Sequence, residues 1–141
     1  MITSRSLNDL LTPVAEKAGR FLVIARDAGI NLLITATYRD AEAQAQLYAQ
    51  GRTAPGKIVT NARAGESFHN WRVALDVVPL EKGQCVWNDD ALWQRVGELG
   101  EQVGLQWGGR WTTLTDKPHF QYTAGLTVRD FQEGKTLPEN A

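Results

Sequence analysis

The sequence predicts an α+β fold, in which a small, mostly antiparallel sheet has helices packed on one side. Segments with apolar residues at helical spacing alternate with short segments rich in β-branched residues. No repeat, low-complexity tract or linker divides the chain, and its 141 residues, 43% of them hydrophobic, are enough for one packed core. We therefore expect a single domain over residues 1–141, with a core from about 7 to 132 and a flexible tail over 133–141.

The first part of the chain predicts a helix, a strand and a second helix. Apolar residues at helical spacing indicate a helix over residues 7–29. The alternating, β-branched segment over residues 30–37 is typical of a strand. Asp40 can cap a second helix that continues through residue 50, and residues 53–56 read as a turn.

The middle of the chain predicts a buried strand, a third helix and another strand. Residues 72–78 are mostly apolar, and Pro79 should end this strand. Gly83 marks a hairpin turn. A third helix should lie between residues 88 and 104, with Asn88 or Asp89 as its N-cap and Gly104 as its stop. Residues 105–107 should form a short strand.

The last part of the chain predicts one more strand and a weak helix. Pro118 disfavours the helical conformation for the residue before it, so residues 119–122 should be extended. On that strand His119 and Gln121 share a face. A weak helical pattern follows over residues 128–132.

Composition and charge exclude several classes of protein. The formal net charge of −1 argues against a protein that a basic surface holds to nucleic acid. Cys85 is the only cysteine, so intramolecular disulfides and cysteine-rich zinc sites are excluded, and we expect a small buried residue there. The N-terminal part has no basic segment followed by a continuous apolar run, so the sequence predicts neither a signal peptide nor a membrane span.

The two histidines of the chain are candidate metal ligands. Asp76 follows His69 by seven positions, and Asp116 precedes His119 by three. Two imidazoles and one carboxylate can supply three ligands to a tetrahedral Zn²⁺ and leave the fourth position open, as in catalytic zinc sites. Asp76 interrupts an otherwise apolar strand, where an unpaired carboxylate is costly unless a cation lies nearby. The residues alone leave two interpretations open, a zinc site or two buried structural histidines.

Two further residues are candidates for the chemistry. Asp116 is either a turn residue before Pro118 or, with zinc at His119, a general base that takes a proton from the metal's water. Arg39, at the end of the strand over residues 30–37, is either a solvated surface arginine or a fixed cation that holds a substrate carbonyl or carboxylate.

Three separated motifs carry a family resemblance. The pattern Y-R-S/D-x-x-x-Q-x-x-L-Y is met at Tyr38, Arg39, Asp40, Gln44, Leu47 and Tyr48. The pattern S-x-H-x-x-G-x-A-x-D is met at Ser67, His69, Ala74 and Asp76. A D-x-x-H followed by an aromatic residue is met at Asp116, His119 and Phe120. In these motifs the chain resembles the zinc peptidases of the VanY-like D-alanyl-D-alanine carboxypeptidase family, especially the L-alanyl-D-glutamate endopeptidases used as phage endolysins.

The resemblance implies a fold and a set of functional residues. The fold is the hedgehog/D-Ala-D-Ala-peptidase-like one, shared with lysostaphin-type enzymes and the signalling domain of hedgehog proteins. The implied zinc ligands are His69, Asp76 and His119. Asp116 would act as general base and then as general acid, Arg39 would steady the oxyanion or the substrate, and Ser67 would contact the substrate.

One position departs from the family pattern. The glycine of the second motif is Arg72 here, so the backbone at that point cannot use a conformation open to glycine alone. We expect Arg72 either to point to solvent or to reshape the rim of the cleft, with an effect on substrate preference.

The activity implied by the resemblance is zinc-dependent cleavage of the peptidoglycan stem peptide, at the L-alanyl-D-glutamate bond. Two alternatives stay open: a D-alanyl-D-alanine carboxypeptidase or dipeptidase, and a non-catalytic zinc-bearing binding module of the same fold. The expected partner is bacterial cell-wall peptidoglycan. Resemblance to phage lysis systems also implies a holin-type partner that releases the protein from the host cytoplasm at lysis. We expect a monomer.

Overall fold

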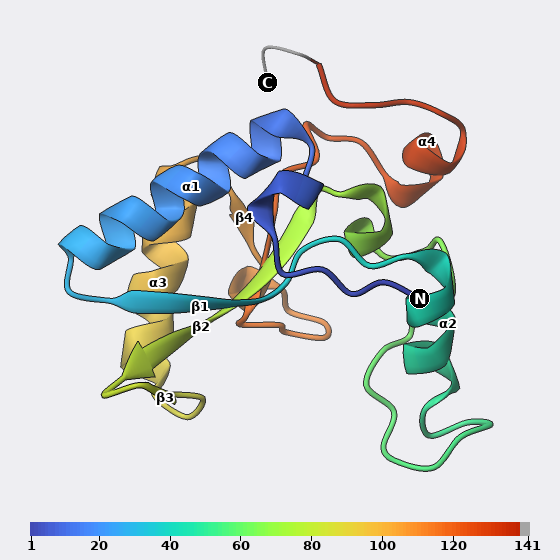
Figure 1. Cartoon of the computed structure of the whole chain (residues 1–141), viewed down its shortest axis with the longest axis horizontal. Helices are drawn as coiled ribbons and strands as arrows, with labels where there is room; N and C mark the ends of the chain where they lie inside the picture. The colour runs from blue at the N-terminus through green and yellow to red at the C-terminus, as the bar shows by residue number, and fades with distance from the viewer. Residues whose placement is uncertain (139–141) are drawn as a thin grey trace.

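The computed structural model describes residues 1–138 (Figure 1). Its strands are β1 (Asn31–Ala36), β2 (Ala74–Glu81), β3 (Gln84–Cys85), β4 (Gln106–Trp107) and β5 (His119–Gln121). They form one sheet in the order β1-β2-β5-β4, with β3 paired to the far end of β2. The strand pairings within the described residues are antiparallel, which confirms the predicted α+β class with a small antiparallel sheet.

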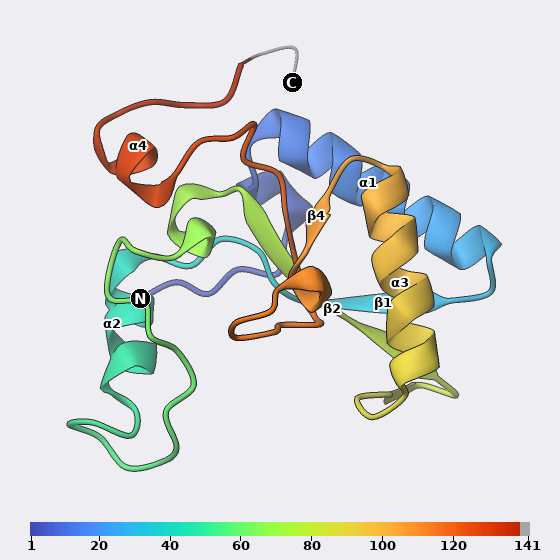
Figure 2. The same cartoon turned by 180° about the vertical axis from the view of Figure 1, so that it is seen from behind.

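Four α-helices and three short 3₁₀ turns complete the described part of the chain. The helices are α1 (Thr12–Asp27), α2 (Ala41–Ala49), α3 (Asp90–Gln102) and α4 (Val128–Gln132). The 3₁₀ turns are η1 (Leu7–Asp9), η2 (Phe68–Trp71) and η3 (Gly108–Arg110). Helices α1 and α3 lie together across one face of the sheet, while α2 and α4 lie toward the other end of the molecule (Figure 1 and Figure 2).

The predicted caps account for where α2 and α3 begin. The side chain of Asp40 accepts a hydrogen bond from the amide of Ala43, and that of Asp89 accepts one from the amide of Leu92. The first helix is shorter than expected, because η1 replaces its first turn and α1 begins only at Thr12. Pro13 has no backbone N–H to donate, so it is tolerated in the first turn of a helix but not farther inside.

The prediction that Pro79 ends its strand is wrong. Strand β2 starts two residues later than expected, at Ala74, and continues through Pro79 to Glu81. The carbonyl of Pro79 accepts a hydrogen bond from the amide of Val86 at 2.9 Å, so the strand turns back on itself as a hairpin with β3. A proline removes a donor from a strand but leaves its acceptor available, and this hairpin uses the acceptor.

The alternation of side chains along the sheet separates a core face from a polar face. Leu75 pairs with Phe120, which packs against Phe21 of α1 at a ring-centroid distance of 4.7 Å. Trp107 lies beside Phe120 on the same face, and Gly97 of α3 lets it approach, since a Cβ at Gly97 would lie 2.3 Å from the indole. Because side chains alternate along a strand, the neighbouring residues of β2 and β5 point to the opposite, polar face and are available to form a site.

Two other expectations are corrected. Cys85 is exposed in β3 and not buried. In the tail over 133–141, Leu137 is buried in the hydrophobic core, so the chain is held to the domain at least to this point, and residues 139–141 lie outside the described part. Within residues 1–138, none of the helices has the length and apolar composition needed to cross a membrane.

Candidate metal centre and active-site pocket

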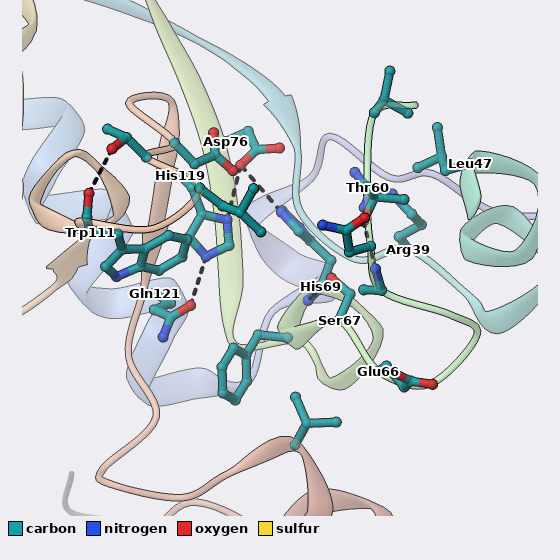
Figure 3. A pocket seen from close by; sticks show the side chains of 18 of the residues that line it. Arg39, Leu47, Thr60, Glu66, Ser67, His69, Asp76, Trp111, His119 and Gln121 are labelled. Carbon is teal, nitrogen blue, oxygen red and sulfur yellow. Dashed lines mark hydrogen bonds and ion pairs between the residues drawn. The ribbon is translucent and has the colours of Figure 1, made fainter. Parts of the chain in front are cut away.

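A pocket of about 840 Å³ opens on the polar face of the sheet (Figure 3). Its floor is formed by Asp76 of β2 with His119 and Gln121 of β5. Its walls include Arg39 and three segments that are far apart in the sequence: residues 58–62 after α2, residues 66–69 at η2, and the segment from 111 to 116 between η3 and β5. The pocket therefore brings together side chains from both halves of the chain.

His69 is held in the pocket by η2 and by the end of β1. The Ser67 hydroxyl accepts a hydrogen bond from the His69 amide at 3.2 Å and so caps η2. The Nδ1 atom of His69 lies 2.8 Å from the carbonyl oxygen of Thr37. A carbonyl can only accept, so this contact places the ring proton on Nδ1. In the neutral ring the lone pair is then on Nε2, which faces Asp76.

Asp76 and His119 are direct partners across the β2–β5 pairing. The Oδ1 atom of Asp76 lies 3.4 Å from Nδ1 of His119 and 3.2 Å from Nε2 of His69. The other ring nitrogen of His119, Nε2, lies 2.7 Å from Oε1 of Gln121. Both imidazoles are buried and turn one nitrogen each toward the same carboxylate oxygen, as Figure 3 shows.

The spacing of these atoms fits a tetrahedral zinc ion. The three donor atoms of His69, Asp76 and His119 lie within 4.8 Å of one another. Bonds of ~2.0–2.1 Å to a tetrahedral zinc place neighbouring ligand atoms about 3.3 Å apart. Both histidine–aspartate distances, 3.2 and 3.4 Å, are close to that value. The donor set, two imidazole nitrogens and one carboxylate oxygen, is also one that zinc prefers.

Two opposing effects act on the charges of this cluster. Burial by itself would raise the pKa of Asp76, but the charge and hydrogen bonds of His69 and His119 outweigh it and hold that pKa well below its usual range. Burial likewise would lower the pKa of His119, yet the hydrogen bond and charge of Asp76 raise it above the ordinary value. The carboxylate of Asp76 is therefore ionised and ready to bind a cation.

Asp116 lies on the rim of the pocket, exposed to solvent. Its backbone is fixed on both sides, because its amide donates to the Gly108 carbonyl at 3.0 Å and its carbonyl accepts from the His119 amide at 3.2 Å. Partial removal from water raises the pKa of Asp116; the charge of His119 opposes this shift and the charge of Asp76 adds to it. The Asp116 carboxyl thus interacts electrostatically with the histidine cluster, and its pKa lies above that of a free aspartate.

Arg39 is a half-buried residue of the pocket wall and not a solvated surface arginine. One guanidinium nitrogen donates to Oε1 of Gln44 at 3.0 Å, while Nε is buried and has no hydrogen-bond partner within the described residues. Burial lowers the pKa of Arg39, and the charges of Asp76 and Asp116 raise it in part, but a guanidinium stays charged in proteins. An unpaired buried donor costs about 1–3 kcal/mol, so Nε is available for a ligand.

Ser67 and Arg72 have structural contacts that the sequence does not reveal. Ser67 lines the pocket but already caps η2, as described above. Arg72 has a left-handed backbone with φ of 64°, and its guanidinium stacks 3.8 Å from the ring centre of Tyr38 and donates to the Asp9 carbonyl at 3.0 Å. Arg72 is not among the described residues that line the pocket, so it does not reshape the cleft rim.

The sequence did not show the roles of several residues that support the site, although Gln44 belongs to the first motif and Trp111 was expected to pack in the core. Gln44, fully buried in α2, accepts from Arg39 and donates to the Ala62 carbonyl at 2.8 Å, so it joins the arginine to the pocket wall. A glutamine on the inward face of a helix is the signal that could have revealed it. Trp111, at the rim, lies 5.1 Å from the His119 ring. The Thr37 carbonyl that orients His69 leaves no signal in the sequence, because every residue has a carbonyl.

Comparisons with known proteins agree with the resemblance noted in the sequence. The matching family model, described as D-alanyl-D-alanine carboxypeptidase, covers residues 60–122, which include both histidines and the aspartates beside them. The chain is 37% identical over 123 residues to the peptidoglycan L-alanyl-D-glutamate endopeptidase CwlK of Bacillus subtilis (strain 168), covering 81% of this chain and 74% of that protein.

Solved structures show the same fold. The L-Ala D-Glu endopeptidase ChiX of Serratia marcescens is similar with a TM-score of 0.64 and 22% identity, over 92% of both chains. The vancomycin resistance D,D-pentapeptidase VanY, solved in complex with Zn(II), is similar with a TM-score of 0.61 and 14% identity, over 87% of this chain and 83% of that one. At these identities the structures support the fold alone. The CwlK match, together with the family model over residues 60–122, shows that the chain belongs to the VanY-like D-alanyl-D-alanine carboxypeptidase family of peptidases.

Proposed function

We propose that the protein is a zinc-dependent peptidase that hydrolyses the stem peptides of bacterial peptidoglycan, at the L-alanyl-D-glutamate bond. The observation that carries the proposal is the convergence of His69, Asp76 and His119 donor atoms within 4.8 Å in an open pocket. The substrate and the bond are supported by the 37% identity to an L-alanyl-D-glutamate endopeptidase of peptidoglycan.

His69 through Nε2, His119 through Nδ1 and Asp76 through Oδ1 would hold the ion. These are the atoms that already face one another. When bound, zinc supplies Lewis acidity, which polarises a carbonyl group and lowers the pKa of water to about 7. The buried position of both imidazoles keeps their rings in place, and the Thr37 carbonyl keeps the proton of His69 away from the ion.

Asp116 and Arg39 would perform the proton transfer and the charge stabilisation. Asp116 would accept a proton from the attacking water as its oxygen bonds to the scissile carbonyl carbon. It would then give that proton to the leaving amine as the C–N bond breaks, and its raised pKa suits both steps. The free Nε donor of Arg39 would bind the carbonyl oxygen as negative charge develops there.

The charges of the pocket favour an endopeptidase over the alternative D-alanyl-D-alanine carboxypeptidase or dipeptidase. Enzymes of that second type need a cation for the free carboxylate of the substrate as well as groups for the oxyanion. Among the described residues that line the pocket, Arg39 is the only lysine or arginine. The described wall thus offers one fixed cation, which suits a substrate that continues on both sides of the cleaved bond.

We further propose that the protein acts as an endolysin, which releases phage by degrading the host cell wall. As an endolysin, the protein would remain in the host cytoplasm as a monomer until a holin-type partner gave it access to the wall. A non-catalytic zinc-binding module of the same fold is the rival outside the enzyme class. The presence of Asp116 and of the unpaired Arg39 donor beside the zinc ligands favours the enzyme.

Digestion of purified peptidoglycan tests the proposal. The zinc-loaded protein is incubated with sacculi, and the soluble products are separated and identified by mass spectrometry. Cleavage at the proposed bond releases stem peptides with a new N-terminal D-glutamate and leaves L-alanine on the glycan. Release of free D-alanine instead would favour the carboxypeptidase, and the absence of any cleavage by a zinc-loaded sample would contradict the enzyme proposal.

A further inference from the structure

We propose that Gln121, held in turn by Gln106, is a positioning residue that sets which nitrogen of His119 is free to bind a metal ion. The inference rests on the zinc site proposed above, and it concerns how the chain prepares one ligand of that site. Gln121 follows His119 by two residues on β5, so both side chains lie on the polar face of the sheet.

The contacts around Gln121 form a short relay. Its Oε1 atom lies 2.7 Å from Nε2 of His119, and its Nε2 atom donates to Oε1 of Gln106 at 3.2 Å. Gln121 is buried, with 7% of its surface exposed, and its backbone pairs with Ala74 on one side and Gln106 on the other. The side chain is therefore held within the sheet and has little freedom to turn.

The direction of this relay determines the protonation of His119. A carbonyl oxygen facing Nε2 accepts the proton of that atom. When a cation takes the place of the Asp76 contact, the neutral ring would therefore keep its proton on Nε2 and offer the lone pair of Nδ1. Nδ1 is the atom that lies 3.4 Å from Asp76. If the amide of Gln121 were reversed, its N–H₂ would face Nε2, the proton would move to Nδ1, and the metal-facing atom would be blocked.

The two histidines differ in how they are oriented. His69 is fixed by the Thr37 carbonyl, a backbone group that substitution of a side chain does not remove. His119 depends on a side-chain amide that can be replaced or reversed. At the relay, one substitution should therefore change a single metal ligand without removing an atom that binds the ion.

Imidazole nitrogen NMR tests this inference on the full-length, zinc-loaded protein labelled with ¹⁵N-histidine. The chain has only two histidines, so each ring is resolved. In the parent protein we expect metal-bound Nδ1 and a slowly exchanging Nε2 proton for His119, and the reverse arrangement for His69. A His119 ring with its proton on Nδ1 would overturn the inference.

Substitution of Gln121 gives the second readout, the zinc dissociation constant measured by chelator competition. Gln121→Leu removes the acceptor and should weaken zinc binding by roughly 10–100-fold and abolish the slow Nε2 proton, with the His69 signals unchanged. Gln121→Glu keeps an oxygen at this position and should restore binding to within a few-fold of the parent. Equal zinc affinity in the parent and Gln121→Leu proteins would contradict the proposal.

Two further variants separate positioning from folding. Gln106→Leu removes only the outer, exposed member of the relay and should weaken zinc binding less than Gln121→Leu does, with the fold retained. Gln94→Leu makes the same substitution on the exposed face of α3 and should leave zinc affinity unchanged. If the parent protein binds zinc and cleaves peptidoglycan while Gln121→Leu keeps its affinity, the relay alone is refuted and the proposed function remains.

Discussion

Asp76 and Asp116 are two carboxyl groups of one pocket whose pKa values shift in opposite directions. Burial opposes ionisation of Asp76, but two imidazoles face it and lower its pKa. Asp116 has no hydrogen-bonded imidazole among the described contacts, and partial removal from water raises its pKa. An acid that stays ionised suits a metal ligand, and one that protonates readily suits a proton carrier. The environment would therefore divide the two proposed roles between chemically identical side chains.

Replacement of Asp116 by alanine tests this division. The side chain is on the rim and, among the described residues, is not one of the three that turn donor atoms toward one another, so Asp116→Ala should keep the zinc content of the parent. The turnover number should fall by roughly 10²–10⁴-fold, the usual contribution of a positioned proton carrier. Both quantities are measured on one preparation, by metal analysis and by peptidoglycan digestion. Cleavage at the parental rate would rule out the assignment.

Arg72 allows a comparison of backbone strain with side-chain contacts. Arg72→Ala keeps a Cβ in the left-handed region and loses the stacking on Tyr38 and the bond to Asp9. Arg72→Gly loses the same contacts but relieves the backbone, which should make it more stable than the alanine variant by about 1 kcal/mol. Urea denaturation of both metal-free variants gives the difference. Equal midpoints would show that the backbone here is unstrained.

At the scale of elements, the turn η3 positions the segment that carries Asp116. The Asp116 amide donates a hydrogen bond of 3.0 Å to the Gly108 carbonyl, and a Cβ built on Gly108 would lie 2.4 Å from the Asp116 carbonyl oxygen. The two backbones can therefore approach only because residue 108 has no side chain. The position of Asp116, the proposed base, therefore depends on Gly108, a residue without a side chain that could react.

Gly108→Ala should move the Asp116 segment away from the histidines. Because a backbone atom cannot yield as a flexible side chain does, we expect a loss of about 1–3 kcal/mol in stability and a lower turnover number. The new Cβ would also lie 3.2 Å from the Cβ of His119, a less severe contact than with Asp116. Zinc affinity should therefore change by less than the turnover number does, since His69 and Asp76 lie on other elements. Parallel losses in zinc affinity and turnover would indicate instead that the whole site is disturbed.

The secondary structure was predictable where local signals act alone. The caps at Asp40 and Asp89, and the helix over 128–132, follow from side chains next to the elements that they begin. The predicted element boundaries were wrong at two prolines, because a proline can either end an element or be accommodated within it. Pro13 shortened the first helix, and Pro79, expected to end β2, lies inside it because its carbonyl is used by the hairpin. Such outcomes depend on tertiary partners that local sequence does not specify.

At the scale of the whole molecule, the site connects three elements far apart in the sequence. His69, Asp76 and His119 belong to η2, β2 and β5, and the pocket walls add the segments after α2 and η3. The sequence motifs predicted which residues meet, since their types suit one metal ion. They could not reveal the hydrogen bonds made by Gln44, Gln121 and the Thr37 carbonyl, because bonds between distant segments follow from packing.

Zinc should therefore stabilise the whole domain. An ion that binds only the folded chain adds about 4 kcal/mol when its free concentration is a thousandfold above its dissociation constant. For a chain of this size the melting temperature should rise by roughly 10 °C. Differential scanning calorimetry with and without a chelator measures this shift. As a control, the Gln94→Leu protein, whose proposed zinc site is unchanged, should show the same shift as the parent. No shift with zinc, or an equal shift with magnesium, would argue against a site of imidazole ligands.

The zinc content of the purified protein tests the central claim most directly. After dialysis against trace zinc, mass spectrometry of the metal should find one zinc ion per folded chain, held by the single donor cluster of the described residues. Asp76→Asn, which keeps the shape of the side chain and removes its charge, should reduce this content well below one. A folded parent protein without zinc, or an Asp76→Asn protein with the full content, would contradict the account.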